Sequence, residues 1–178
     1  MQQQARVRLD LLAAAGLATG ALFGVGGSLM HTPVWREFLY EISSVGLVVG
    51  AALLTVRYLM AGDAAAAAGF LVLAIGEAVM SGGTVAEPGA ARASFGAGMA
   101  LYVPALVLVG LSRSFPLWVR IVGVLAGAPF LLAAAKIFLD GPVFSTDALP
   151  GAGYGLLTLT IVGWIATILR RTPVKDNG

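Results

Sequence analysis

Long runs without a charged residue are the feature that most constrains how this chain can fold. No Asp, Glu, Lys or Arg lies between residues 10 and 36, between 92 and 113, or between 147 and 170. Each run can supply a helix that crosses the hydrocarbon core of a bilayer, which takes about 20 apolar residues. Only 11% of the residues are charged, whereas a soluble domain has about 25%. The sequence therefore predicts an integral membrane protein.

Turn-forming residues divide the apolar sequence into six predicted transmembrane helices. Breakers such as Thr32-Pro33, Ala61-Gly62-Asp63 and Phe115-Pro116 separate them. The predicted spans lie near residues 10–30, 42–60, 64–82, 94–112, 117–139 and 149–169. The connections are short, so we expect an all-α, polytopic six-helix bundle that forms a single integral membrane domain over residues 1–178.

The distribution of basic residues predicts the orientation of the bundle. With both termini in the cytoplasm, eight Lys and Arg residues fall on the inner side and three on the outer side. The inner residues are Arg6, Arg8, Arg57, Arg113, Arg120, Arg170, Arg171 and Lys175, and the outer ones are Arg36, Arg92 and Lys136. This bias obeys the positive-inside rule and predicts an N-in, C-in topology. Trp35 and Tyr40 are then expected at the outer interface, and Tyr58 and Trp118 at the inner one.

Several chemistries are excluded by residues that the chain lacks. It has no cysteine, which excludes disulfides, thiolate metal sites and iron–sulfur clusters. Its one histidine, His31, cannot form a multi-histidine zinc or di-iron centre. The basic residues are scattered at predicted helix ends rather than clustered, so we expect no nucleic-acid partner. No metal and no cofactor is predicted.

Small residues spaced four apart predict close contacts between helices. These pairs are Ala14/Ala18, Gly16/Gly20, Gly20/Gly24, Gly46/Gly50 and Gly123/Gly127. Lipid provides little hydrophobic drive for helix association, so close backbone approach must supply much of the packing energy.

Glu77 is the residue that most suggests a functional site. It lies within the third predicted span, near the C-terminal end of that helix, where the helix dipole and the surrounding hydrocarbon both disfavour a negative charge. A nearby cation, a hydrogen bond from Ser81 or protonation must offset this cost. Three interpretations remain open: a structural ion pair with Lys136 or Arg92, snorkelling to the outer surface, and a functional role as proton acceptor or ligand anchor.

Other polar residues are predicted on the same outer side of the membrane. They are His31, Glu37, Glu41, Glu87 and Asp140, which could converge with Glu77 and Lys136. The catalytic candidates are Glu77 and Lys136, and the ligand-binding candidates are Glu77, Lys136, Glu41 and His31. The simpler interpretations are a snorkelling lysine for Lys136 and a solvated loop histidine for His31.

One stretch of the sequence resembles a known family. Arg113-Ser114, Pro116 and Trp118, followed by residues 123–127 (GVLAG), resemble a signature of uncharacterised bacterial multi-pass membrane proteins that carry a domain of unknown function. Glu77-Ala78 is similar to a Glu-Ala step of that family, but Ala74 stands where the family has an arginine. The resemblance implies a helical bundle with a similar number of spans, in a bacterial cytoplasmic (inner) membrane, and implies no activity.

Three functions are compatible with these features. We favour a non-enzymatic membrane bundle that packs with partner subunits or with copies of itself, or that binds a hydrophobic ligand, with membrane lipid around it. The first alternative is an enzyme acting on a lipid or isoprenoid, with Glu77 as acid or base in an outer-leaflet pocket. The second is a transporter or channel for a small solute, whose polar route would depend on Thr19, Thr55, Tyr102, Thr158 and Thr160. Hydroxyls in helices commonly bond to their own backbone instead.

Overall fold

The protein is a bundle of six membrane-spanning helices, as predicted. The computed structural model describes residues 2–82, 88–139, 141, 143–145 and 147–171. The helices are α1 (Gln2–Leu29), α2 (Pro33–Leu59), α3 (Ala64–Gly82), α4 (Pro88–Leu111), α5 (Leu117–Leu139) and α6 (Ala148–Arg171). Each is long and apolar enough to cross a bilayer.

Helices α3 and α5 match their predicted spans, whereas the other four begin earlier than predicted, most importantly α2. This helix begins at Pro33, whereas the predicted span began near residue 42. Proline is favoured in the first turn of a helix, because its missing N–H has no partner to lose there. The prediction followed the apolar segment alone and left out the charged first turns. As a result, Glu37 and Glu41 lie on a helix rather than in a loop.

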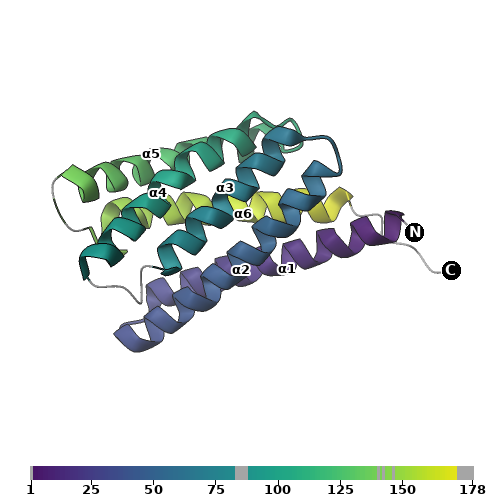
Figure 1. Ribbon diagram of the computed structural model, residues 1–178. Coiled ribbons are helices and arrows are strands. Elements are labelled where there is room, and N and C mark those ends of the chain that lie inside the picture. Colours follow the sequence, from purple (N-terminus) through teal and green to yellow (C-terminus); the bar gives the residue numbers. More distant parts are fainter. Residues whose placement is uncertain (1, 83–87, 140, 142, 146, 172–178) are drawn as a thin grey trace.

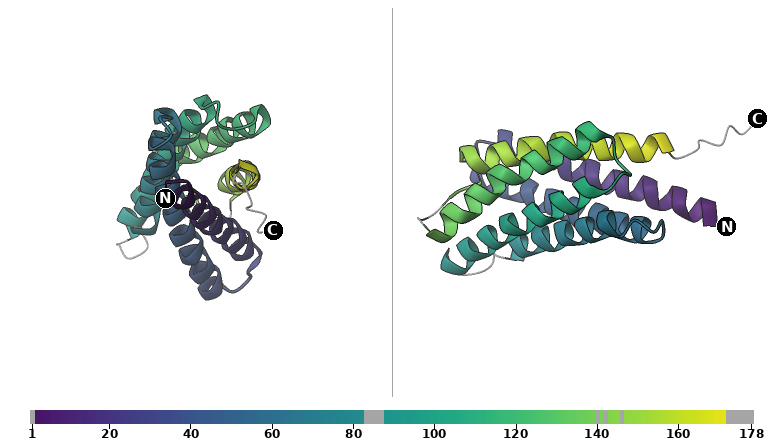
Figure 2. Two further views of the ribbon diagram at one scale, coloured as in Figure 1. Left: turned by 90° about the vertical axis from the view of Figure 1, so that its right-hand side faces the viewer. Right: turned by 90° about the horizontal axis from the view of Figure 1, so that it is seen from above.

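The six helices form a ring in the order of the chain (Figures 1 and 2). Each helix packs against the next, and α6 returns to pack against α1. The view along the bundle shows α6 between the α1–α2 hairpin and α5. Helix α6 also reaches α3 across the ring, because the ring of Trp164 packs edge-on against Phe70 with 4.9 Å between their centroids.

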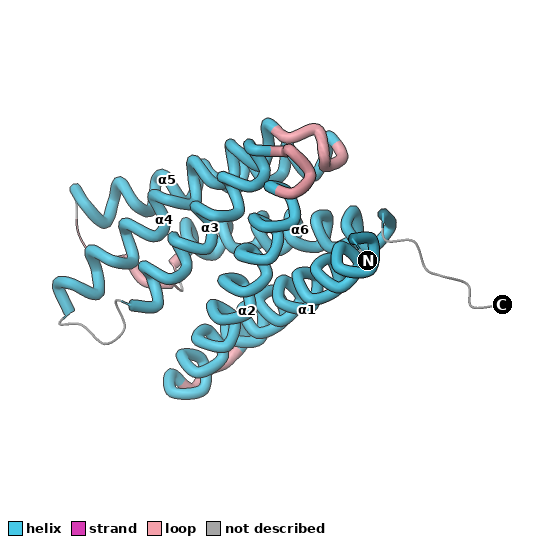
Figure 3. Tube along the Cα trace, turned by 45° about the vertical axis from the view of Figure 1, so that its right-hand side comes forward, coloured by secondary structure: helices cyan, strands magenta, loops and turns pink. Residues whose placement is uncertain are grey.

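The two ends of the bundle are distinguished by the parts of the chain that lie there. Helix α1 begins and α6 ends at the same end, which we call the termini end; α1 joins α2 at the opposite, distal end. At the termini end the α2–α3 and α4–α5 connections lie side by side (Figure 3). Asp63 joins them, because its carboxylate accepts hydrogen bonds from Ser112 Oγ at 2.5 Å and from Ser114 Oγ at 2.6 Å.

Asp63 also caps α3, since its Oδ1 accepts a hydrogen bond of 3.1 Å from the backbone N–H of Ala66. Burial by itself raises the pKa of Asp63, but the hydrogen bonds from Ser112, Ser114 and Ala66 outweigh that effect. The net result is a pKa below its ordinary value.

Glycines bring α1 and α2 into backbone contact. A Cβ atom added at Gly16 would lie 2.8 Å from the backbone nitrogen of Gly50, and one added at Gly46 would lie 2.7 Å from that of Gly20. Neither site has room for any side chain. The predicted glycine pairs on these two helices therefore lie in the α1–α2 interface.

Asp10 and Arg57 connect the same two helices near the termini end. Arg57 Nε lies 2.9 Å from Asp10 Oδ1, and the side chains of Arg57 and Asp10 are 22% and 8% exposed. The guanidinium group of Arg57 compensates the negative charge of Asp10, which the apolar packing around α1 would otherwise leave without a partner.

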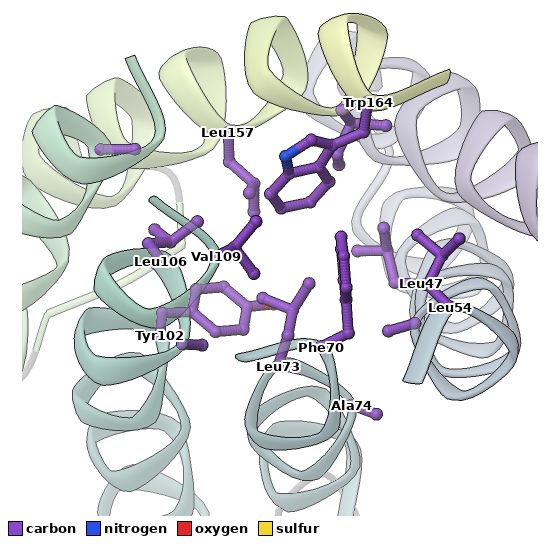
Figure 4. Close-up of a cluster of buried hydrophobic side chains, with 14 of the residues drawn as sticks. Leu47, Leu54, Phe70, Leu73, Ala74, Tyr102, Leu106, Val109, Leu157 and Trp164 are labelled. Atoms are coloured by element: carbon purple, nitrogen blue, oxygen red, sulfur yellow. The ribbon is translucent and has the colours of Figure 1, made fainter. Parts of the chain in front are cut away.

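Four aromatic rings fill the bundle toward the termini end. They belong to Tyr58, Phe70, Phe115 and Trp164, all of which are buried; Figure 4 shows Phe70 and Trp164 facing each other inside the ring. Tyr58 stacks on Phe70 with 5.7 Å between ring centroids. The ring of Tyr58, which was expected among the interfacial aromatic residues, turns inward and joins this cluster instead of facing the membrane.

Candidate functional site

Glu77 is buried inside the bundle and is held by two hydroxyl groups. The residue is 3% exposed. Ser44 Oγ on α2 donates a hydrogen bond of 2.7 Å to Glu77 Oε2, and the hydroxyl of Tyr102 on α4 donates one to Oε1. Helix α3 packs between α2 and α4, so both neighbours reach the same carboxyl group.

A large cavity lies beside Glu77 in the distal half of the bundle. Its volume is about 1200 Å³, compared with about 300–1,000 Å³ for typical small-molecule sites. Side chains from α1, α2, α3, α4, α6 and the segment before α6 line it. Leu29, Val34 and Phe144 line its distal edge and are all exposed. The cavity therefore has apolar walls that open toward the distal end.

One face of α2 carries acidic groups along the cavity. Glu37, Glu41 and Ser44 all line it, and their spacing of four and three residues places them on the same side of a helix. At about 1.5 Å per residue, this stripe runs roughly 10 Å from Glu37 down to Ser44. Ser44 then contacts Glu77, so the stripe leads from the distal end to the buried carboxyl group.

Helix α6 contributes an aromatic side chain and open glycines to the cavity wall. The ring of Tyr154 packs edge-on against Phe130 and Tyr102, with centroid distances of 5.1 and 6.4 Å. Gly151 and Gly155 also line the cavity, and a Cβ atom added at either position meets nothing within 4 Å. These glycines border empty space rather than a neighbouring helix.

The structure does not form the predicted ion pair of Glu77 with Lys136 or Arg92. Helix α5, which carries Lys136, is not adjacent to α3, and the Lys136 side chain is exposed. Arg92 instead donates a hydrogen bond of 2.6 Å to the backbone carbonyl of Ile137. Glu77 does not snorkel to the surface either, since it is buried.

The other predicted outer residues separate into three groups. Glu37 and Glu41 line the cavity with Glu77. His31 is exposed in the α1–α2 turn and does not line the cavity. Glu87 and Asp140 lie outside the described residues.

The sequence pattern does not single out Ser44 or Tyr154 as site residues, and it suggests Tyr102 only as part of a solute route. A signal for Ser44 exists, because it continues the spacing of Glu37 and Glu41 along one helix face. It becomes informative only once α2 is known to begin at Pro33.

Two of the five hydroxyls proposed for a solute route donate hydrogen bonds to their own helices. Thr55 donates to the Ala51 carbonyl at 3.0 Å, and Thr160 donates to the Leu156 carbonyl at 2.8 Å. Thr158 is different, since it lines the cavity. Among the residues that the structure describes, no three His, Asp or Glu side chains lie close enough to hold a metal ion.

Comparison of the chain with family models, with curated proteins and with solved structures finds no match. The resemblance of residues 111–127 to uncharacterised bacterial membrane proteins therefore stays a prediction.

Proposed function

We propose that the protein is a non-enzymatic membrane bundle that binds one amphipathic molecule, with its chain in the distal cavity and its polar head near Glu77. The cavity is the observation that carries this proposal. Apolar walls favour a hydrocarbon chain, and a few convergent polar groups fix the orientation of a ligand. Leu29, Val34 and Phe144 at the exposed edge provide an apolar entrance for such a chain.

The aromatic cluster favours a binding site over a channel. Trp164 lies one turn beyond Ile161, which lines the cavity, and Phe70 lies two turns before Glu77 on α3. Both positions are on the termini side of the cavity, where packed aromatic side chains fill the space enclosed by the helices. A ligand that enters from the distal end therefore meets a closed floor.

The orientation of the bundle determines to which side of the membrane the cavity opens. The excess of Lys and Arg at the termini end favours that end in the cytoplasm. With that N-in, C-in topology, the cavity opens to the outer leaflet of the membrane.

Filling the cavity tests the proposal. Gly155→Phe places a ring in open space, whereas Val162→Phe places the same ring on an exposed face of α6 and serves as the matched control. The variants are extracted with their surrounding membrane in a styrene–maleic acid polymer, and the retained molecules are identified by mass spectrometry. We expect an amphiphile retained by the wild type and by Val162→Phe but lost from Gly155→Phe. Equal retention by all three contradicts the proposal.

A lipid-processing enzyme is the second candidate. The observation in its favour is that two carboxyl groups, those of Glu77 and Glu41, line one cavity; an acid and a base in reach of one substrate is what such catalysis needs. Incubating the reconstituted protein with the amphiphile that it retains tests this candidate. A change in the mass of the amphiphile that Glu77→Gln abolishes supports an enzyme, and an unchanged mass supports a binding protein.

A further inference from the structure

The described lining of the cavity carries acidic side chains and no basic ones. Three of its lining residues are glutamates, and no Lys, Arg or His is among the described residues that line it. Buried or membrane-embedded carboxylates are normally compensated by a cation or by several hydrogen bonds. From the described residues, the carboxyl group of Glu77 receives two hydrogen bonds, both from neutral hydroxyl groups.

The two outer glutamates are not neutralised along their own helix. Glu37 and Glu41 face each other at a spacing of four residues, which destabilises a helix when both are charged. Their neighbours three and four residues away are Pro33, Val34, Phe38, Tyr40, Ser44 and Val45. None of these is basic. Arg36 is adjacent in sequence, but neighbouring residues on a helix point in different directions.

We infer that the ligand of the cavity is a cationic amphiphile: an amine or quaternary ammonium group on a hydrocarbon chain. This inference rests on the proposed binding function and deepens it. A cation beside Glu41 relieves the repulsion between Glu37 and Glu41. That position is one helical turn from Ser44, which contacts Glu77, so the same cation also offsets a negative charge on Glu77. An anionic head meets repulsion at every carboxylate, and a neutral head leaves the charges uncompensated.

Three twelve-carbon probes that differ only in their heads test the inference: dodecyltrimethylammonium, dodecyl maltoside and dodecanoate. Binding is measured by equilibrium dialysis to the full-length protein in phosphatidylcholine nanodiscs, with empty nanodiscs subtracted. We expect the cationic probe to bind about ten- to one-hundredfold more tightly than the other two, because interactions with charged groups typically contribute that much to affinity. Glu41→Gln and Glu37→Gln are each expected to weaken only the cationic probe.

Asp147→Asn is the matched control, because it removes one carboxylate near the distal end that does not line the cavity. Its amide oxygen can still accept the hydrogen bond that the backbone N–H of Phe144 donates to Asp147. This variant is expected to bind all three probes like the wild type. An equal loss of the cationic probe in Asp147→Asn and Glu41→Gln overturns the inference, since it reports only the general surface charge.

Gly155→Phe separates failure of the inference from failure of the proposed function. Suppose that Gly155→Phe abolishes binding of every probe, but the wild type binds the neutral probe as tightly as the cationic one. The cavity then binds amphiphiles without selecting for a positive charge, so the proposed function holds and the inference fails. If Gly155→Phe affects no probe, the cavity is not the binding site, and both the function and the inference fail.

Discussion

The hydroxyl of Tyr102 on α4 donates a hydrogen bond to the carboxyl group of Glu77 on α3, inside a membrane-spanning bundle. Both residues are buried, with Tyr102 0% and Glu77 3% exposed. An acid at this depth is stable only where neighbouring helices bring donors to it. The contact therefore fixes the rotation of α3 relative to α4, as well as the position of the acid at the cavity.

Replacing Tyr102 with Phe is expected to destabilise the bundle. The change leaves one oxygen of Glu77 without its donor, at a cost of about 1–3 kcal/mol in the free energy of unfolding. Tyr154→Phe is the control, because the one hydrogen-bond partner of the Tyr154 hydroxyl among the described residues is the weak acceptor Met80 Sδ, at 3.5 Å. Unfolding of both variants by dodecyl sulfate in mixed micelles measures the difference. An equal loss in the two variants contradicts a special role for the Tyr102 contact.

Gly46→Val is expected to separate α1 from α2. The added Cβ would lie 2.7 Å from the backbone nitrogen of Gly20, and backbone cannot move aside as a side chain can. We expect a loss of at least about 1–3 kcal/mol, the usual cost of overpacking. Gly155→Val, where the added Cβ meets nothing within 4 Å, is expected to fold like the wild type. Thermal aggregation assays on the two variants compare them directly.

We expect substitutions of Asp10 and Arg57 to have non-additive effects on stability. Asp10→Asn and Arg57→Met each remove one partner of a largely buried ion pair and leave the other uncompensated. The double variant leaves no such charge, so its loss of stability should be smaller than the sum of the two single losses. The expected coupling is about 0.5–3 kcal/mol. Strictly additive losses show that the pair contributes nothing.

We expect the bundle to lose stability in acid because of Asp63. The pKa of Asp63 is lowered in the folded protein by Ser112, Ser114 and Ala66. The stabilisation is therefore complete above the unfolded pKa, which is about 3.9, and is lost as the pH falls through the lower folded value. Melting curves recorded between pH 6 and about 2.5 should fall more steeply for the wild type than for Asp63→Asn. Parallel curves contradict a stabilising role for the charged form of Asp63.

The orientation can be tested directly because the chain has no cysteine of its own. His31→Cys lies in the exposed α1–α2 turn at the distal end, and Ala61→Cys lies in the exposed α2–α3 turn at the termini end. With both termini in the cytoplasm, a membrane-impermeant maleimide added to intact cells should label only His31→Cys. Labelling of Ala61→Cys alone shows the opposite topology.

The sequence predicts what depends on hydrophobicity and spacing. The number of helices and the glycine interface of α1 and α2 follow from uncharged runs and from small residues four apart. The membrane position of Glu77 follows in the same way. These features need no knowledge of how one helix is rotated against another.

The surroundings of Glu77 depend on that rotation, and the sequence did not predict them. Lys136 lies at a depth similar to that of Glu77 by residue count, but the ring order places α5 away from α3. Ser44 and Tyr102 become partners of Glu77 only because α3 turns its acid toward α2 on one side and α4 on the other. Tyr58 likewise turns inward instead of toward the membrane interface.

The ring order has a consequence for biosynthesis. Neighbours in the chain are neighbours in space, so α1 to α5 can pair one after another as they leave the ribosome. Helix α6 follows these five in the chain and brings Tyr154, Gly155 and Thr158 to the cavity. We expect membrane lipid to occupy the place of this part of the wall until α6 inserts, so that membrane molecules are already present when the cavity closes.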